Sequence, residues 1–174
     1  YAAVDLLQNV IIYCSSVKRS IAQNAADPLI DLLLIKASDK NSRIQKASID
    51  MIMKLVNQKN IGVTLIAKHL QKPQGKKKGP SLHIKLMLLK KLIPVYKFEK
   101  SGLKVNDIMR LVEDGLNNPK KEVRAEAIDV AVEVGKTNPS ICVQSKYLSK
   151  LTNQGIINTL QSALEKHGLP VKGD

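Results

Sequence analysis

An amphipathic helical pattern occurs twice in this chain, 79 residues apart. In residues 39–56 and again in residues 118–135, the positions expected to be buried have the same helical spacing, and an Ile-Asp pair recurs in register. The matching positions are Ile44, Ser48, Met51, Ile52 and Leu55 in the first copy and Val123, Ala127, Val130, Ala131 and Val134 in the second. Half of that interval gives a third copy at Ile84, Leu88, Lys91, Leu92 and Val95, where only Lys91 breaks the pattern. A period of about 40 residues is typical of solenoids built from helix pairs.

Turn and cap signals between these stripes predict one all-α domain over residues 1–174, an α-solenoid of about four helix pairs. The pairs are placed at residues 1–38, 39–72, 80–117 and 118–168. Asp27 and Asn118 each precede a proline, which predicts an N-cap followed by proline at the first helical position. Asp39, Asn41 and Ser42 are cap candidates for the next helix and Asn60 for its partner, and Pro94 is expected to kink or end its helix. The expected helices are 1–26, 29–37, 39–57, 61–71, 81–96, 105–116, 118–135 and 155–167.

The composition favours helices packed on helices. The apolar residues are mostly Leu, Ile, Val and Ala, with no Trp and one Phe. The apolar runs are too short to span a bilayer and no cleavable signal is found, so we expect an intracellular protein without a membrane partner. Because the chain begins at Tyr1, we expect it to be a piece of a longer protein. Cys14 and Cys142 lack metal-ligand spacing and are expected to be reduced and packed.

Positive charge is concentrated in the middle of the sequence. The chain has 28 Lys and Arg against 15 Asp and Glu, a net charge of +13. Between Lys59 and Lys104, twelve lysines face one acidic residue, Glu99, which leaves a net +11 in that segment. Such a field attracts an acidic partner, and a nucleic acid, an anionic membrane surface or an acidic protein all fit it. The lysine run 76–78 is expected to be a solvated loop on the edge opposite the turns inside each pair.

The sequence contains no recognisable catalytic or metal-binding motif. His69, His83 and His167 lack the spacing of zinc-enzyme motifs, and each is expected to lie at the surface or half-buried. Residues 75–81 resemble a phosphate loop only superficially, because the G-K-[ST] ending is missing. No Ser, Cys or Thr has an identifiable base partner, and the shared helix face of Glu122 and Glu126 needs no chemistry to explain it. We therefore expect a protein that is not an enzyme and uses no cofactor or metal.

The repeated helix openings DKNSRIQKASID and NPKKEVRAEAID, with a proline near the end of a first helix, resemble HEAT repeats. A small, basic HEAT array with lysine-bearing turns along one edge is similar to a TOG domain, the tubulin-binding module of microtubule regulators. Within that family the sequence most resembles the TOG domain of a centrosomal protein of the ciliary tip. The resemblance covers residues 24–136. TOG domains usually have six repeats and a Trp on the first turn, so this chain either lacks upstream repeats or is divergent.

In TOG domains, the turns that join the two helices of each pair meet tubulin. The resemblance places these turns at 24–27, 58–61, 97–105 and from 136 onward, as a row along one edge. It implies a monomer that binds αβ-tubulin or microtubules, acts at microtubule ends, and lies in the cytoplasm and cytoskeleton at the centrosome, centriole and ciliary tip. The implied tubulin-binding residues are Lys59, Asn60, Lys97, Lys100, Lys104, Lys136 and Asn138.

Two other classes of function stay open from the sequence. A HEAT scaffold would dock another acidic protein or a helix along its groove. A HEAT-like DNA glycosylase would also be small, basic and helical. It would need aromatic residues against the bases and an acid in a basic groove, whereas aromatic residues make up only 3% of this chain. Nucleic acid is therefore the less favoured partner.

Overall fold

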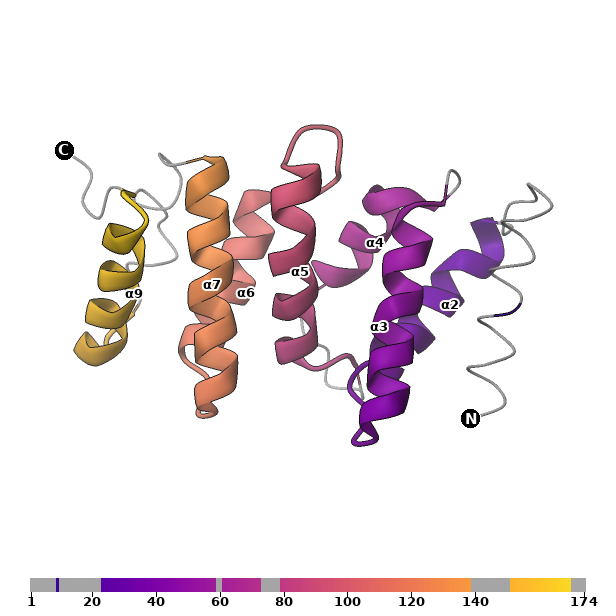
Figure 1. Ribbon diagram of the computed structural model, residues 1–174, viewed down its shortest axis with the longest axis horizontal. Coiled ribbons are helices and arrows are strands. Elements are labelled where there is room, and N and C mark those ends of the chain that lie inside the picture. The colour runs from indigo at the N-terminus through magenta and orange to yellow at the C-terminus, as the bar shows by residue number, and fades with distance from the viewer. Residues whose placement is uncertain (1–8, 10–22, 59–60, 73–78, 139–150, 170–174) are drawn as a thin grey trace. The chain divides into compact units, whose positions relative to one another are not determined.

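The computed structural model describes residues 9, 23–58, 61–72, 79–138 and 151–169. Within these residues the protein consists of helices without strands, so the predicted all-α class is confirmed (Figure 1). The chain forms two compact units, residues 1–84 and residues 85–174. The helices are α2 (Gln23–Lys36), α3 (Ser42–Val56), α4 (Gly62–Leu70), α5 (Leu82–Tyr96), α6 (Val105–Leu116), α7 (Lys121–Thr137) and α9 (Gln154–Lys166).

In the first unit, α2 packs against both α3 and α4, which also pack against each other. The large buried apolar side chains are mostly Leu and Ile from all three helices, with Met51 from the predicted stripe of α3. Asn41 is the N-cap of α3, and its side chain accepts hydrogen bonds from the N–H groups of Arg43 and Ile44. Three residues before Asn41, the Ser38 hydroxyl accepts a hydrogen bond of 2.8 Å from the N–H of Ser81, just before α5 begins.

The start of α2 differs from the prediction. Residues 24–27 are helical, so the turn expected there does not exist, Asp27 is not an N-cap, and Pro28 lies inside the helix. The carboxylate of Asp27 bonds to His69 of α4 rather than to the start of its own helix. Pro28 deprives α2 of one backbone hydrogen bond, and the burial of Ile30, Leu33 and Leu34 offsets that loss.

In the second unit, α6 and α7 lie side by side and α9 packs on α7. The close approach of α6 to α7 depends on Gly115, because a Cβ atom there would come within 2.7 Å of the Ala127 Cβ atom. The bounds of α5 and α6 agree with the predicted 81–96 and 105–116 to within one residue. The predicted cap of α7 is wrong by two residues: its N-cap is Lys120, and the Asn118 side chain accepts from the Lys120 N–H in a turn before the helix.

The buried stripes agree with the prediction in α3 and α7. All five positions are buried in α7, and in α3 only Ile44 is half-buried. In α5, which holds the third copy, Ile84, Leu88 and Leu92 are buried. Lys91 is exposed, as expected, but Val95, which was expected to be buried, is 68% exposed. Val95 follows Pro94 in the last turn of α5.

Several other expectations concern the chain ends and loops. The last helix, α9, lies where a helix at 155–167 was expected. Among the described helices, none is long and apolar enough to cross a membrane. Cys14, Cys142, Asn60 and the lysine run 76–78 lie outside the described residues. The N-cap position of α4 is Ile61, which makes no side-chain cap hydrogen bond.

Candidate binding surface

The α5–α6 corner, residues 97–104, is the most fully described of the corners predicted to bind. It begins where the Lys97 N–H donates to the Ile93 carbonyl at 2.9 Å and ends at Lys104, the N-cap of α6. Ser101 is buried inside it, where its hydroxyl donates to the Lys97 carbonyl at 2.7 Å and accepts from the Leu103 N–H at 3.2 Å. These bonds, with the buried Leu103 side chain, fix the corner in one conformation.

Two lysines of this corner have a backbone conformation that normally favours glycine. Lys97 has φ 52° and Lys100 has φ 60°, the only positive φ values of non-glycine residues in the part of the chain that the structure describes. The left-handed region costs a residue with a Cβ atom about 1 kcal/mol. Gly102 also has a positive φ, of 74°, but glycine adopts this conformation without that cost. Lysine thus occupies two positions at which glycine would be free of this cost.

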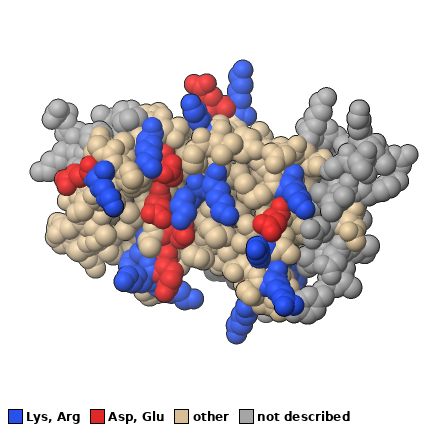
Figure 2. All heavy atoms as spheres, in the orientation of Figure 1, with Lys and Arg blue, Asp and Glu red and all other residues tan. Residues whose placement is uncertain are grey.

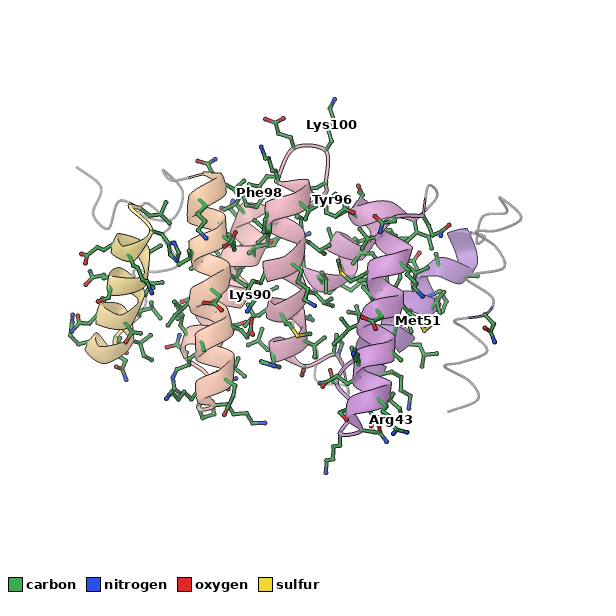
Figure 3. All side chains as sticks on the ribbon, in the orientation of Figure 1. Arg43, Met51, Lys90, Tyr96, Phe98 and Lys100 are labelled. Atoms are coloured by element: carbon green, nitrogen blue, oxygen red, sulfur yellow. The ribbon has the colours of Figure 1, made fainter. Side chains whose placement is uncertain are left out.

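The corner presents apolar groups as well as charge. Val95 is the most exposed large apolar side chain among the described residues, and it stands directly before the corner. Figure 3 shows Tyr96 and Phe98 at the end of α5 and Lys100 extending away from the protein. Phe98 is half-buried and is the only Phe in the sequence. A partner that meets this corner therefore contacts an apolar patch bordered by ammonium groups, a combination that the sequence prediction, based on charge, did not include.

The C-terminal end of α7 supplies the next predicted residues. Figure 1 shows this end of α7 and the α5–α6 corner at the same end of the second unit. Lys136 is exposed and its ammonium group lies 2.8 Å from Glu133 Oε1, one turn earlier. Asn138 is the C-cap of α7, and its N–H donates to the Val134 carbonyl at 2.8 Å. Lys136 therefore has a carboxylate neighbour that reduces its local field, whereas no acidic partner of Lys97 is found among the described residues.

In the first unit the predicted corner is the turn between α3 and α4. Gln58 and Ile61 delimit it, and the Gln58 carbonyl accepts from the N–H groups of Ile61 and Gly62 at 3.1 and 2.9 Å. Gly62 has φ 62°, which allows the tight entry into α4. The two residues assigned to tubulin contact in this turn, Lys59 and Asn60, lie outside the described residues.

The positive segment 59–104 is less positive in space than in sequence. Lys68 and Lys72 lie 3.8 and 3.7 Å from Asp27 and Asp31 of α2. Lys90 lies between two carboxylates of α7, and Lys85 is buried. Figure 2 shows acidic and basic side chains interspersed over the face in view. At the α5–α6 corner, Lys97, Lys100 and Lys104 stay exposed, together with the acidic Glu99.

The corner between α6 and α7, at the opposite end of the second unit, is also basic. Lys120 and Lys121 are exposed there, and Arg124 donates to the carbonyl groups of Asn118 and Pro119 at 2.8 and 2.7 Å. Neither lysine has an ion pair within the described part of the chain. These two lysines provide a control surface of the same charge for any test of the α5–α6 corner.

Lys90 joins α5 to α7 through two ion pairs. The ammonium group of Lys90, which Figure 3 labels, lies 2.7 Å from Glu126 Oε2 and 3.0 Å from Asp129 Oδ2. Burial by itself lowers the pKa of Lys90, but the hydrogen bonds to Glu126 and Asp129 outweigh burial and raise the pKa above its ordinary value. Lys90 takes the register position that Asp50 and Asp129 hold in the other two copies, which places opposite charges on α5 and α7.

The histidine predictions are confirmed for two residues and wrong for the third. His83 is half-buried and His167 is exposed, but His69 is 2% exposed and both its ring nitrogens face carboxylates of α2. The hydrogen bond from His69 is the largest of the effects that hold the pKa of Asp27 below its ordinary value. Asp27 and Asp31 are four residues apart in a helix that the sequence analysis placed differently, so the pairing was missed.

Comparison with known proteins identifies the fold. The chain matches the family model described as "Centrosomal protein CEP104, TOG domain" over residues 2–130. The TOG domain structure from C. elegans Zyg9 has a TM-score of 0.77 and 13% identity, over 95% of this chain and 60% of that one. The TOG domain of human Cep104 has a TM-score of 0.71 and 19% identity, over 99% of this chain and 67% of that one. No curated protein matches the chain.

Proposed function

Because this chain belongs to the TOG domain family of centrosomal protein CEP104, and TOG domains are tubulin-binding modules, we propose that it binds αβ-tubulin through the corners inside its helix pairs. The residues proposed for this contact are those implied by the family resemblance. They are Lys59, Asn60, Lys97, Lys100, Lys104, Lys136 and Asn138, to which we add Phe98 of the α5–α6 corner and Val95 in the last turn of α5.

The α5–α6 corner carries the proposal. Lys97 and Lys100 occupy strained backbone positions that a buried serine holds in place, and strain of this kind is concentrated at binding sites. Because the corner is already ordered, little conformational entropy is lost when a partner binds. The lysines attract an acidic surface and speed its approach, and the exposed Val95 side chain adds apolar contact once the surfaces meet.

A charge-reversal experiment tests the corner. Lys97→Glu, Lys100→Glu and Lys104→Glu together are expected to weaken tubulin binding by about tenfold or more, because three favourable charge contacts of roughly 0.5 kcal/mol each are lost. Glu has the same backbone preference as Lys in the left-handed region, so the fold should be retained. The affinity is measured by fluorescence anisotropy with labelled tubulin, and folding by circular dichroism.

The matched control reverses three exposed lysines: Lys40, which precedes α3, and Lys120 and Lys121, which are the N-cap and the first residue of α7. Each set of three changes lowers the net charge from +13 to +7, so both alter the overall field equally. The control is expected to lose at most about threefold in affinity, through the weaker long-range field alone. A control that loses as much as the corner variant, or more, would refute the corner as the tubulin contact.

We further propose that the protein acts without catalysis at microtubule ends, and that it functions at centrosomes or ciliary tips, as the CEP104 family relation supports. Rigid helix pairs hold several corners at fixed spacing, so the effect on the polymer follows from binding. Fluorescence microscopy of growing microtubules tests this: the chain should change growth rate or catastrophe frequency, and the corner variant should not. Equal effects of the two proteins would contradict it.

A further inference from the structure

Glu99 is an acidic residue in the middle of the basic α5–α6 corner. It lies between Lys97 and Lys100, and it is the only acid in residues 59–104. Its side chain is exposed, and it forms no hydrogen bond or ion pair within the part of the chain that the structure describes. The lysines of the corner stand close to Glu99 in the sequence, yet none of them pairs with its carboxylate. Glu99 is therefore free to pair with a group on a partner.

The corner holds the backbone of Glu99 in a defined place. The positive φ values of Lys97 and Lys100 determine the path of the chain on both sides of it. The buried Ser101 hydroxyl closes the turn through its bonds to the Lys97 carbonyl and the Leu103 N–H. A side chain on a fixed backbone loses less conformational entropy when it pairs with a partner. Glu99 is thus presented on the same ordered turn as the two lysines.

A carboxylate at this place weakens the attraction to a purely acidic partner. Residues 97–104 contain three lysines and one glutamate, so Glu99 reduces their net charge from +3 to +2. Phosphate groups of a nucleic acid that approach the lysines of the corner are repelled by Glu99. A protein surface can instead place carboxylates opposite the lysines and a cation opposite Glu99. The charge pattern therefore favours a protein partner that carries both signs of charge.

The apolar side chains beside Glu99 favour the same kind of partner. Val95 is 68% exposed, and Phe98, the residue before Glu99, is half-buried. Figure 3 shows Phe98 near the end of α5 and Lys100 extending away from the protein. Apolar groups bordered by charged ones are typical of protein interfaces, in which the apolar centre is shielded from water. Most contacts with a nucleic acid are made to phosphate and sugar groups, which leave such apolar side chains without a counterpart.

We propose that Glu99 is a specificity-determining residue of the corner: it pairs with a lysine or arginine side chain of tubulin and disfavours the binding of nucleic acids. This role rests on the proposed function, because it names a group on the tubulin surface that the corner recognises. Lys97 and Lys100 contact carboxylates beside that cation. Alternating charges fix how the two surfaces align, since a displaced contact brings like charges together.

Charge reversal at Glu99 tests this role. Glu99→Lys should weaken tubulin binding by about tenfold, because an ion pair is lost and a repulsion takes its place. Glu99 has no positive φ, so the exchange should add no backbone strain. Glu99→Asp keeps the charge and should retain the affinity to within about twofold. The affinity is measured by fluorescence anisotropy with labelled tubulin, and folding by circular dichroism. Unchanged or tighter tubulin binding by Glu99→Lys, as a purely acidic tubulin surface would give, would overturn the proposal.

Asp114→Lys is the matched control. Asp114 is exposed near the C-terminal end of α6, whereas the corner precedes the start of that helix. Each of the two changes raises the net charge from +13 to +15, so both alter the overall field equally. The control should change the tubulin affinity by less than about twofold. An equal loss of affinity in both variants would contradict the proposal, because the effect would not depend on the corner.

Binding to duplex DNA of random sequence at low salt tests the discrimination against nucleic acids. Both lysine variants should bind DNA more tightly than the unaltered chain, because their net charge is higher. Glu99→Lys should exceed Asp114→Lys by about threefold, because it also removes a carboxylate from the exposed basic corner. Equal DNA affinities of the two variants would show that Glu99 does not discriminate. A chain that does not bind tubulin would refute the proposed function, and the DNA comparison, which needs no tubulin, distinguishes that failure from a failure of Glu99.

Discussion

Replacing Gly115 by alanine places a methyl group between two closely packed helices. Gly115 lies in α6 and is buried. Its added Cβ would lie 2.7 Å from the Ala127 Cβ and 2.8 Å from the Leu86 Cδ1. Carbon atoms in good contact are about 3.5–4.0 Å apart, so both contacts are short by roughly 1 Å. The end of Leu86 can rotate, but the Ala127 Cβ is fixed to the backbone of α7, and α6 must therefore move away from α7.

Two opposing effects set the size of the change. Alanine is favoured over glycine inside a helix by about 1 kcal/mol. Overpacking of a core costs about 1–3 kcal/mol, and separating α6 from α7 also weakens the burial of neighbouring side chains. Because the contact involves backbone-fixed atoms of both helices, we expect the upper part of that range. The variant should be destabilised by about 1–2 kcal/mol in net free energy of unfolding.

Urea denaturation of the purified chain measures this change, with Gly155→Ala as the matched control. Gly155 is exposed in the first turn of α9, where a Cβ atom would meet only Asn153 Oδ1 at 3.3 Å. The control should change stability by less than about 0.5 kcal/mol or increase it. The double variant Gly115→Ala with Ala127→Gly should be more stable than the sum of the two single changes in free energy of unfolding predicts, because removing the Ala127 methyl group makes room for the new one. A Gly115→Ala chain as stable as the unaltered chain would refute this account of the α6–α7 contact.

Three further predictions concern strain, a buried hydroxyl and pH. Lys97→Gly should stabilise the protein by about 0.5–1 kcal/mol, because glycine adopts a left-handed backbone without strain, and should weaken tubulin binding, because a positive charge is lost. The free energy of unfolding measured by urea denaturation should therefore rise, while the tubulin affinity measured by fluorescence anisotropy should fall. Ser48→Ala should stabilise by about 1 kcal/mol, because the buried Ser48 hydroxyl has no hydrogen-bond partner, while the register-equivalent Ala127→Ser should destabilise. The pKa of Asp27 is lower in the folded protein than its ordinary value of 3.8, so ionised Asp27 stabilises the fold fully above pH 3.8, and this stabilisation is lost as the pH falls through the folded-state pKa. In thermal melting at different pH values, Asp27→Asn should reduce the loss of stability at acidic pH. The control Asp39→Asn should leave that loss unchanged.

The helices could be predicted from the sequence because their signals are local. Apolar spacing placed α6 at residues 105–116, its observed bounds, and the α7 stripe is buried at every predicted position. Predictions that depended on a single cap residue were less accurate. Asp27 precedes a proline as an N-cap does, yet its carboxylate bonds to His69, 42 residues later. A side chain that can cap a helix can also bond elsewhere, and the local sequence does not distinguish these cases.

The candidate site was only partly predictable. The corner lysines were found from their position between two helices, but the exposure of Val95 and the backbone conformations of Lys97 and Lys100 were not. The net charge of the segment 59–104 overestimated its field, because the acids that pair with Lys68, Lys72 and Lys90 come from other helices. A count along the sequence includes only neighbours in the chain, whereas electrostatic fields depend on neighbours in space.

By itself, the sequence determined the helical period, the amphipathic stripes and, through them, the family resemblance. These features depend on side-chain spacing within a single helix, which is a property of consecutive residues. The tertiary structure decided which lysines stay exposed, that His69 is buried between two aspartates, and that α6 and α7 meet at Gly115. Those features depend on packing between helices that are distant in the chain, and packing distances arise only when the chain has folded.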